Sequence, residues 1–96
     1  MTTFFIANVS VKNPEKFQEY AQKSGATFAA YGGAPLARGK VAGNLVGSSE
    51  HQAAAVIKFP DLDSLNNWFN SPEYQALVPL RDQAADMIIT NYQIPA

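Results

Sequence analysis

Two arginines are the residues of this chain best suited to bind an anionic ligand. Arg38 lies in a stretch bounded by glycines, and Arg81 follows a helical pattern that contains a proline. A planar guanidinium can bind a carboxylate or an enolate oxygen through two parallel N–H donors. Each arginine could instead form a surface or interface ion pair with one of the eight acidic residues. The sequence leaves both interpretations open.

Four aromatic side chains could form the walls of a small-molecule pocket beside these arginines. They fall on helical stripes that should face a sheet, where an aromatic ring fills core and its polar tip finds a hydrogen-bond partner. Core filling is the simpler interpretation, and the alternative is an apolar pocket with a few polar groups, as is usual for small-molecule sites. The candidate ligand-binding residues are therefore Tyr20, Tyr31, Arg38, Trp68, Tyr74 and Arg81, and no catalytic residue is assigned.

The remaining polar pairs are weaker candidates. His51 beside Glu50 has the chemistry of a general base with an orienting carboxylate, but its expected place in a hairpin turn favours a solvated pair. Asp61 and Asp63 have the spacing of a metal-binding pair, although the start of a helix explains Asp61. With a single histidine and no cysteine, the chain lacks the usual set of metal ligands. We expect no metal and no cofactor.

Length and charge exclude several classes of protein. The 96 residues suit one domain spanning positions 1–96, and the net charge of −1 provides no basic stripe for phosphates. Nucleic acid and membrane are therefore not expected as partners. No segment is long and apolar enough to cross a bilayer, and the N-terminal stretch does not resemble a secretory leader. We expect a cytoplasmic protein.

Alternating apolar residues predict four strands. Residues 3–11, 53–59 and 86–93 are expected to form regular strands, whereas 35–46 is interrupted by glycines and is expected to be bent or bulged. The first strand is apolar on both faces, because Phe4 and Ile6 lie opposite Phe5 and Ala7. Helices on one side of a sheet cannot cover both faces, and a large apolar patch left in water is unusual in a monomer. The sequence therefore predicts a homodimer paired through the sheet faces.

Cap residues place the helices. Asn13 before Pro14 predicts one helix, which Gly32 and Gly33 should end. Asp61 caps a second helix, and Ser71 before Pro72 caps a third, which Pro79 should kink. The resulting βαββαβ order predicts an α+β fold with a four-stranded antiparallel sheet and helices on one face.

Several short motifs together resemble one family. They are Glu19-Tyr20, Tyr31-Gly32-Gly33, Leu36-Ala37-Arg38-Gly39, Phe59-Pro60, Trp68, and Ser71-Pro72-Glu73-Tyr74-Gln75-Ala76-Leu77 with Arg81. The combination is similar to the domain-of-unknown-function 1330 family over nearly the whole chain. The resemblance implies a ferredoxin-like fold of the dimeric α/β-barrel superfamily, in which two sheets pair back to back.

The chain departs from that family at two positions. Family members usually carry a second glycine where Lys40 stands, and a glutamate where Val46 stands between Leu45 and Gly47. That glutamate is the family's candidate general base or carboxylate anchor. A fainter similarity links Trp68 and Tyr74 to cofactor-free quinone-forming monooxygenases of the same superfamily, whose preceding asparagine is replaced here by Ser64.

Two functions therefore remain open. The first is a dimeric protein that binds a small metabolite in a pocket between sheet and helices. The alternative is a cofactor-independent monooxygenase or isomerase acting on a small aromatic or enolisable compound, with Arg38 or Arg81 stabilising an oxyanion. A shared fold assigns no reaction by itself.

Overall fold

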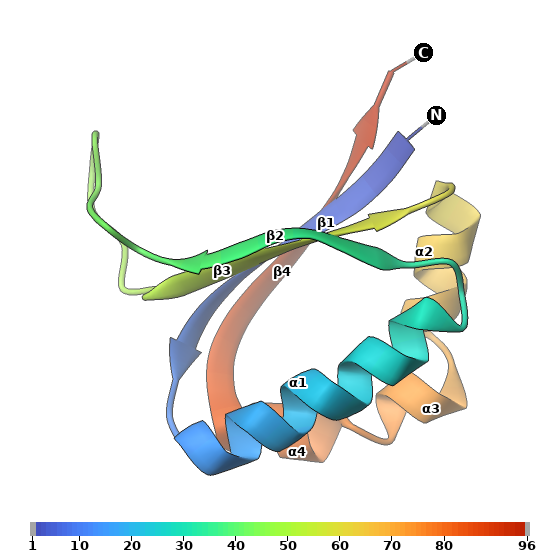
Figure 1. Ribbon diagram of the computed structural model, residues 1–96, viewed down its shortest axis with the longest axis horizontal. Coiled ribbons are helices and arrows are strands. Elements are labelled where there is room, and N and C mark those ends of the chain that lie inside the picture. Colours follow the sequence, from blue (N-terminus) through green and yellow to red (C-terminus); the bar gives the residue numbers. More distant parts are fainter. Residues whose placement is uncertain (1, 96) are drawn as a thin grey trace.

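The structure, a computed structural model, describes residues 2–95 as one sheet with helices on one face. The elements in chain order are β1 (Thr2–Val11), α1 (Pro14–Ala29), β2 (Ala34–Lys40), β3 (Ala53–Phe59), α2 (Leu62–Phe69), α3 (Pro72–Gln75), α4 (Val78–Ala84) and β4 (Ala85–Ile94). The strands form an antiparallel sheet in the order β2-β3-β1-β4 (Figure 1). The expected α+β, ferredoxin-like fold is confirmed.

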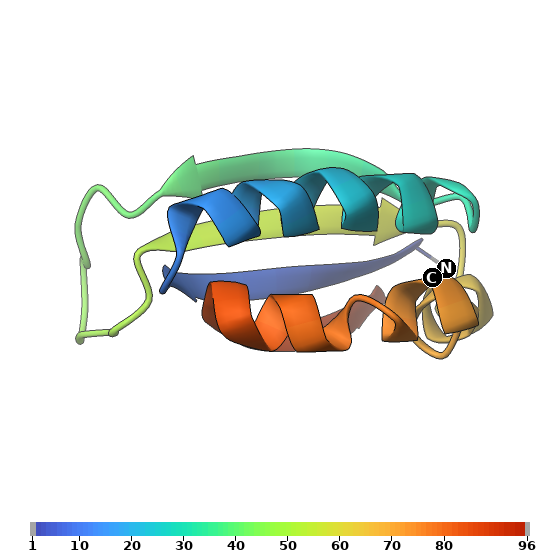
Figure 2. The same cartoon turned by 90° about the horizontal axis from the view of Figure 1, so that it is seen from below.

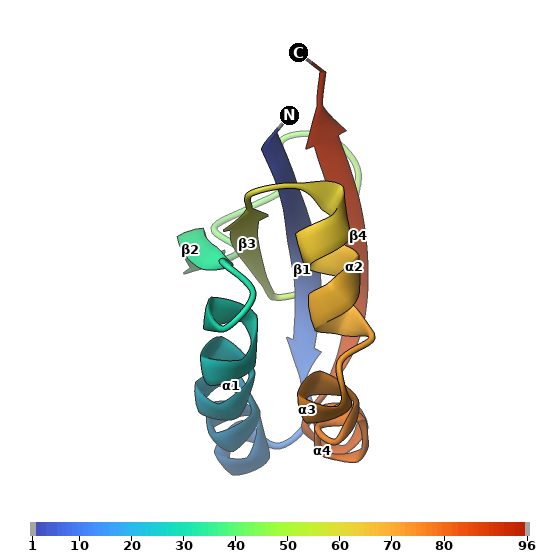
Figure 3. The ribbon, with the colours of Figure 1, turned by 90° about the vertical axis from the view of Figure 1, so that its right-hand side faces the viewer.

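The helices form a second layer beneath this sheet. α1 and α4 lie side by side (Figure 2), and α2 packs against β1 (Figure 3). β1 begins where β4 ends, because Thr2 pairs with Ile94. Within residues 2–95, no helix combines the length and the apolar character that a bilayer span requires.

Local hydrogen bonds explain where the helices begin and end. The side chain of Asn13 accepts a hydrogen bond from the Lys16 backbone N–H at 3.1 Å, so it caps α1 as expected. α1 ends at Ala29, a few residues before the two glycines, and Gly32 has a φ of 82°, which a residue without a Cβ adopts readily. Gly33 then turns the chain into β2 with its N–H donating to the Phe28 carbonyl at 2.8 Å.

The segment after Ser71 differs from the expectation of a single kinked helix. The Ser71 hydroxyl caps α3 by accepting from the Tyr74 N–H at 3.2 Å. The chain then breaks into two helices, and Pro79 stands in the first turn of α4. Proline has no N–H to donate, and the first turn of a helix is where a missing donor costs least. A new helix start, rather than a kink, therefore accommodates Pro79.

The second strand is shorter and more irregular than expected. β2 ends at Lys40, not at Val46, and the residues from 41 to 52 form a loop that projects beyond the sheet (Figure 1). The irregularity lies not at a glycine but between Pro35 and Ala37, where one extra residue, Leu36, has no partner in β3. This bulge determines which face each later side chain of β2 occupies.

The sheet has a covered inner face and an open outer face. Phe5 and Phe59 point inward with Trp68 and Tyr74 of the helices, and these side chains are at most 5% exposed. Phe4 and Ile6 point outward, and Phe4 stacks on Tyr92 with ring centroids 5.2 Å apart. Further apolar residues on the outer face are Val56, Ile88 and Ile94, of which Ile88 and Ile94 are about half exposed. The two-faced apolar character expected from the sequence is present.

Candidate functional site

A cavity of about 110 Å³ lies between the inner face of the sheet and the helices. All four strands, α1 and α2 contribute to its walls. The lining residues are Phe5, Ala7, Val9, Phe17, Tyr20, Ala21, Ser24, Gly25, Phe28, Arg38, Ala55, Ile57, Trp68, Met87 and Ile89. Larger hollows of about 370 and 540 Å³ open more widely on the surface, whereas this cavity is more enclosed and mostly apolar. Its lining, mostly apolar with a few polar groups, is of the kind found in small-molecule sites, although its volume is well below theirs.

Arg38 is the one lining residue that carries a formal charge. It lies on β2 opposite Ala55, an inner-face residue of β3, and it is exposed. Within residues 2–95, no side chain forms an ion pair or a hydrogen bond with its guanidinium. Arg38 thus brings an unpaired cation to the wall of an apolar cavity.

A chain of three polar groups runs from this cavity into the helix layer. The Tyr20 and Tyr74 hydroxyl oxygens are 2.8 Å apart, and the Arg81 guanidinium donates to the Tyr74 hydroxyl at 3.0 Å. Because arginine can only donate, Tyr74 accepts from Arg81. Tyr74 is fully buried and lines no cavity, so its own proton is best satisfied by the Tyr20 oxygen. In that arrangement Tyr20 accepts from Tyr74, and its own proton can point to the cavity, where the Ser24 side chain also lies close to it.

Tyr20 is a proton donor rather than a base at neutral pH. Burial, followed by the nearby Tyr74 hydroxyl, raises the pKa of Tyr20 far above its ordinary value. A neutral phenol in this environment keeps its proton and can donate a hydrogen bond to an anion. The polar groups that line the cavity are therefore two hydroxyls, of Tyr20 and Ser24, and the guanidinium of Arg38.

Trp68 contributes its ring, not its N–H, to the cavity. Its indole N–H donates to the Thr27 hydroxyl at 3.0 Å, and Thr27 in turn donates to the Ser24 carbonyl at 2.7 Å. The indole stacks on Phe5 with a centroid separation of 5.2 Å and an interplanar angle of 10°. These contacts hold the indole in a fixed orientation at the edge of the cavity.

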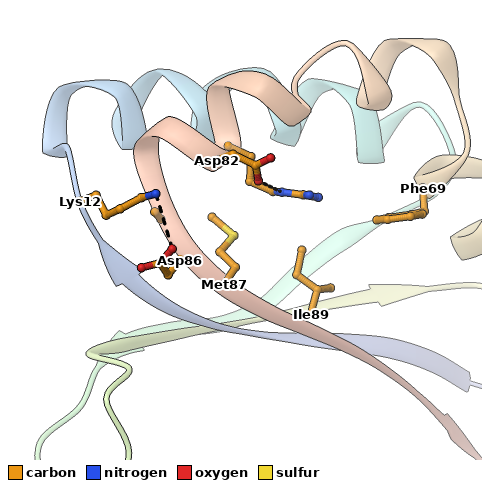
Figure 4. Close-up of a pocket in the computed structure, with 8 residues that line it drawn as sticks. Lys12, Phe69, Asp82, Asp86, Met87 and Ile89 are labelled. Atoms are coloured by element: carbon orange, nitrogen blue, oxygen red, sulfur yellow. Dashed lines mark ion pairs between the residues drawn. The ribbon is translucent and has the colours of Figure 1, made fainter.

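Arg81 faces a second hollow, of about 370 Å³, beside β4. Figure 4 shows Lys12 and Phe69 at its sides, with Met87 and Ile89 projecting into it from β4. Lys12 lies 3.5 Å from an Asp86 carboxylate oxygen, and the Arg81 Nε lies 3.5 Å from an Asp82 carboxylate oxygen. Both cations of this hollow, Lys12 and Arg81, are therefore already paired with carboxylates of the chain. Met87 and Ile89 also line the cavity, so these two side chains stand between the two spaces.

The structure brings some predicted site residues together and separates others. Tyr20, Arg38 and Trp68 line the cavity, while Tyr74 and Arg81 reach it only through the Tyr20 hydroxyl. Tyr31 packs against the core as expected, but it lies beyond the helix and does not line the cavity. It follows the end of α1, is half-buried, and lines a surface hollow with Ala26, Thr27, Ala30 and Glu73.

The other candidates lie outside the cavity. The Ser10 hydroxyl donates to the Glu50 carbonyl at 3.0 Å and lies 3.2 Å from the His51 Nδ1, so His51 carries a proton on Nδ1 if both bonds form. The carboxylate of Asp61 accepts from the Ser64 N–H at 2.7 Å, and this bond lowers the pKa of Asp61. Across residues 2–95, no three His, Asp or Glu side chains gather in an arrangement that could hold a metal ion.

Of the first-helix residues that line the cavity, sequence reasoning identified only Tyr20. The other first-helix residues that line it were not named as candidates; they are Phe17, Ala21, Ser24, Gly25 and Phe28. The usable signal was Ser24, a small polar residue inside an apolar stripe. Val46, at the position of the family glutamate, is 95% exposed on the projecting loop and does not line the cavity.

Comparison with known proteins gives a family and a fold. The family described as Domain of unknown function (DUF1330) matches residues 2–92. A solved protein of unknown function from Rhodopseudomonas palustris is similar with a TM-score of 0.84 at 17% identity, covering 99% of this chain and 83% of that one. No curated protein matches the sequence.

Two further solved structures share the fold. SnoaB from Streptomyces nogalater, a cofactor-independent oxygenase, has a TM-score of 0.73 at 11% identity, with 99% of this chain and 94% of that chain covered. A dimeric ferredoxin-like protein of unknown function from Thermobifida fusca has a TM-score of 0.65 at 16% identity, with 98% and 92% covered. At these identities the similarity establishes the fold alone.

Proposed function

Given that this chain belongs to the DUF1330 family, we propose that it is a homodimeric protein that binds a small organic molecule between its sheet and its helices. The observation that carries the proposal is the cavity of about 110 Å³, with its apolar walls and three polar groups. A well-packed interior has few voids larger than a water molecule. An apolar space of this size, lined by large aromatic residues, is better explained as room for a ligand.

The polar groups on the cavity wall favour binding over catalysis. Tyr20 holds its proton because burial raises its pKa, and Arg38 is permanently charged. Both are suited to hold a ligand oxygen in place. Proton abstraction needs a group whose pKa is near the working pH, and this constellation consists of donors.

The homodimer is supported by the outer face of the sheet. Phe4, Ile6, Val56, Ile88 and Tyr92 form one apolar surface across three adjacent strands, and Ile88 is 55% exposed. Sheets that pack face to face bury such surfaces in a shared core. We propose a second copy of this chain as the occupant, since solved structures with this fold are described as dimeric.

The single tryptophan supplies a direct test of the binding proposal. Trp68 lines the cavity and is 1% exposed, so a ligand that enters should change its fluorescence. Titration with small ring compounds, both neutral and acidic, is expected to give saturable changes. Ala21→Leu adds an isopropyl group to the cavity wall and should abolish the change, while Ala26→Leu, on the exposed side of α1, should preserve it.

The opposite pattern would remove the cavity from consideration. If Ala21→Leu binds as well as Ala26→Leu and the wild type, the ligand lies elsewhere. If no small ring compound perturbs Trp68 at millimolar concentration, the cavity is not a binding site.

The alternative function is a cofactor-independent monooxygenase. The observation that favours it is the chain from Arg81 through Tyr74 to Tyr20, which could stabilise a developing oxyanion at the cavity wall. SnoaB, which shares the fold, is described as a cofactor-independent oxygenase. A phenolic substrate would consume one O₂ and yield a quinone and one water. Oxygen uptake that depends on Tyr74 and Arg81 would support this alternative, and binding without uptake would count against it.

A further inference from the structure

We infer that the ligand of this cavity is a small monoanion with an apolar, ring-sized body, whose carboxylate binds Arg38. The inference rests on the proposed function, because it names the class of molecule that the same cavity would hold. Four features of the structure support it: the bulge in β2, the charge on the cavity wall, the size of the cavity and the donors on α1.

The bulge in β2 is what brings Arg38 to the cavity. Side chains alternate between the two faces of a strand, and Pro35 pairs with Ile57 on the inner face. Without the extra residue Leu36, Arg38 would pair with Ala54 and point to the outer face. With the bulge, Arg38 pairs with Ala55 and lies on the inner face. Bulges often redirect a side chain beside a functional site, and this one gives the cavity its cation.

The charge on the cavity wall selects for an anion. Arg38 is the one formally charged residue among those that line the space, and no described residue neutralises it. Arg38 is exposed, so water screens part of its attraction for a carboxylate, but its paired N–H donors still favour a carboxylate over a neutral group. No carboxylate lines the cavity to pair with an ammonium group, so a zwitterionic amino acid would leave its own cation unpaired.

The size and lining of the cavity define the rest of the ligand. An apolar protein cavity of about 150 Å³ can hold benzene, and the cavity here is about 110 Å³. Phe5 and Trp68, which stack on each other with an interplanar angle of 10°, both contribute to its apolar lining. The cavity is smaller than one that holds benzene, so it would enclose a short branched chain or part of a single ring, with the carboxylate extending toward the exposed Arg38 on the edge strand.

Donors on α1 complete the site. If Tyr74 donates to Tyr20, the Tyr20 proton can be offered to a ligand, and the raised pKa of Tyr20 keeps that proton in place at neutral pH. The cavity thus has a hydroxyl donor on its helix side and a guanidinium on its sheet side, and a carboxylate, which can only accept, suits such donors.

Benzoate is the probe for this inference, with benzyl alcohol as the neutral ring and phenylalanine as the zwitterion. Binding is followed by Trp68 fluorescence and by thermal shift. Wild-type protein is expected to bind benzoate at least about tenfold more tightly than benzyl alcohol, since a hydrogen bond to a charged group is stronger than one between neutral groups. Phenylalanine should bind more weakly than benzoate.

Variants at two neighbouring positions separate the role of Arg38 from the general charge. Arg38→Met should reduce benzoate affinity about tenfold or more and leave benzyl alcohol affinity unchanged. Arg38→Lys should recover only part of the benzoate affinity, because lysine lacks the planar pair of donors. Lys40→Met removes the same charge from the same face of β2 but lies outside the cavity lining, so benzoate should bind within about twofold of wild type. Arg38 is exposed, and circular dichroism should show each variant folded.

Each contrary outcome is distinct. If benzyl alcohol binds as tightly as benzoate, or if Arg38→Met retains the preference for benzoate, the anion inference is wrong while the binding proposal stands. If Lys40→Met loses as much benzoate affinity as Arg38→Met, the effect comes from the overall positive charge of this face, and the specific role of Arg38 is wrong. If neither ring compound binds, both the inference and the proposed function fail.

Discussion

Replacing Tyr74 by phenylalanine tests the hydrogen-bonded chain that connects the cavity with the helix layer. The Tyr74 hydroxyl is fully buried, lies 2.8 Å from the Tyr20 hydroxyl and accepts from Arg81 at 3.0 Å. Phenylalanine keeps the ring, which packs 4.4 Å from Trp68 between centroids, but leaves both partners without their bond. A lost buried hydrogen bond costs about 0.5–1.5 kcal/mol, and an unsatisfied partner costs about 1–3 kcal/mol. We expect Tyr74→Phe to lower the free energy of unfolding by about 2–3 kcal/mol.

Urea denaturation at fixed protein concentration, followed by Trp68 fluorescence, measures this change. Tyr31→Phe is the matched control, because Tyr31 is half-buried and its hydroxyl forms no hydrogen bond within the described residues; it should change stability by less than about 0.5 kcal/mol. Tyr20→Phe and Tyr74→Phe remove the same hydrogen bond, so the double variant should lose about 1 kcal/mol less stability than the sum of the two single variants. A Tyr74→Phe protein as stable as wild type, or strictly additive effects, would refute the chain as a stabilising unit.

Three further outcomes are expected. Sedimentation of the wild type at micromolar concentration should give about twice the 10.4 kDa chain mass, and a monomer would contradict the dimer. Ile6→Lys, which places a charge on the apolar outer face, should yield monomers or unfolded protein. Gly33→Ala should lower the free energy of unfolding by about 1–3 kcal/mol, because the added Cβ would lie 2.8 Å from the ring of Phe59 and 2.9 Å from the Phe28 carbonyl oxygen; Gly39→Ala, with no atom within 4 Å, is the control. Burial and Tyr74 raise the pKa of Tyr20 above its ordinary value of 10.0, so the unfolded chain loses this proton at a lower pH than the folded protein does. The free energy of unfolding should therefore fall by about 1.4 kcal/mol per pH unit above about pH 10. Tyr20→Phe should remove that slope, and the same slope in the variant and the wild type would show that Tyr20 ionises normally.

Features that depend on a few neighbouring residues could be predicted from the sequence. Asn13, Asp61 and Ser71 each cap a helix as expected, because an N-cap bond joins residues only two or three positions apart. The alternation of Phe4 and Phe5 likewise indicated a strand with two apolar faces. These local signals were sufficient to derive the order of elements and the fold.

Features that depend on pairing between distant segments could not be predicted. The bulge at Leu36 exists only because β2 pairs with β3, so the sequence of β2 did not reveal that Arg38 would face the helices. The end of β2 at Lys40 also depends on pairing with β3. The last paired residues are Lys40 and Ala53, and after one more bond, from the Val41 N–H to the Gln52 carbonyl at 2.7 Å, the chain leaves the sheet. The contact between Tyr20 and Tyr74 joins residues 54 positions apart, and neither residue alone indicated it.

A crystal structure of the protein soaked with benzoate tests the central claim most directly. The account predicts electron density for the ring between the inner face of the sheet and α1, against Phe5 and Trp68, with the carboxylate within hydrogen-bond distance of the Arg38 guanidinium. The ligand should be absent from crystals of the Ala21→Leu protein under the same conditions. A cavity closed by its own side chains, or benzoate bound only outside it, would contradict the account.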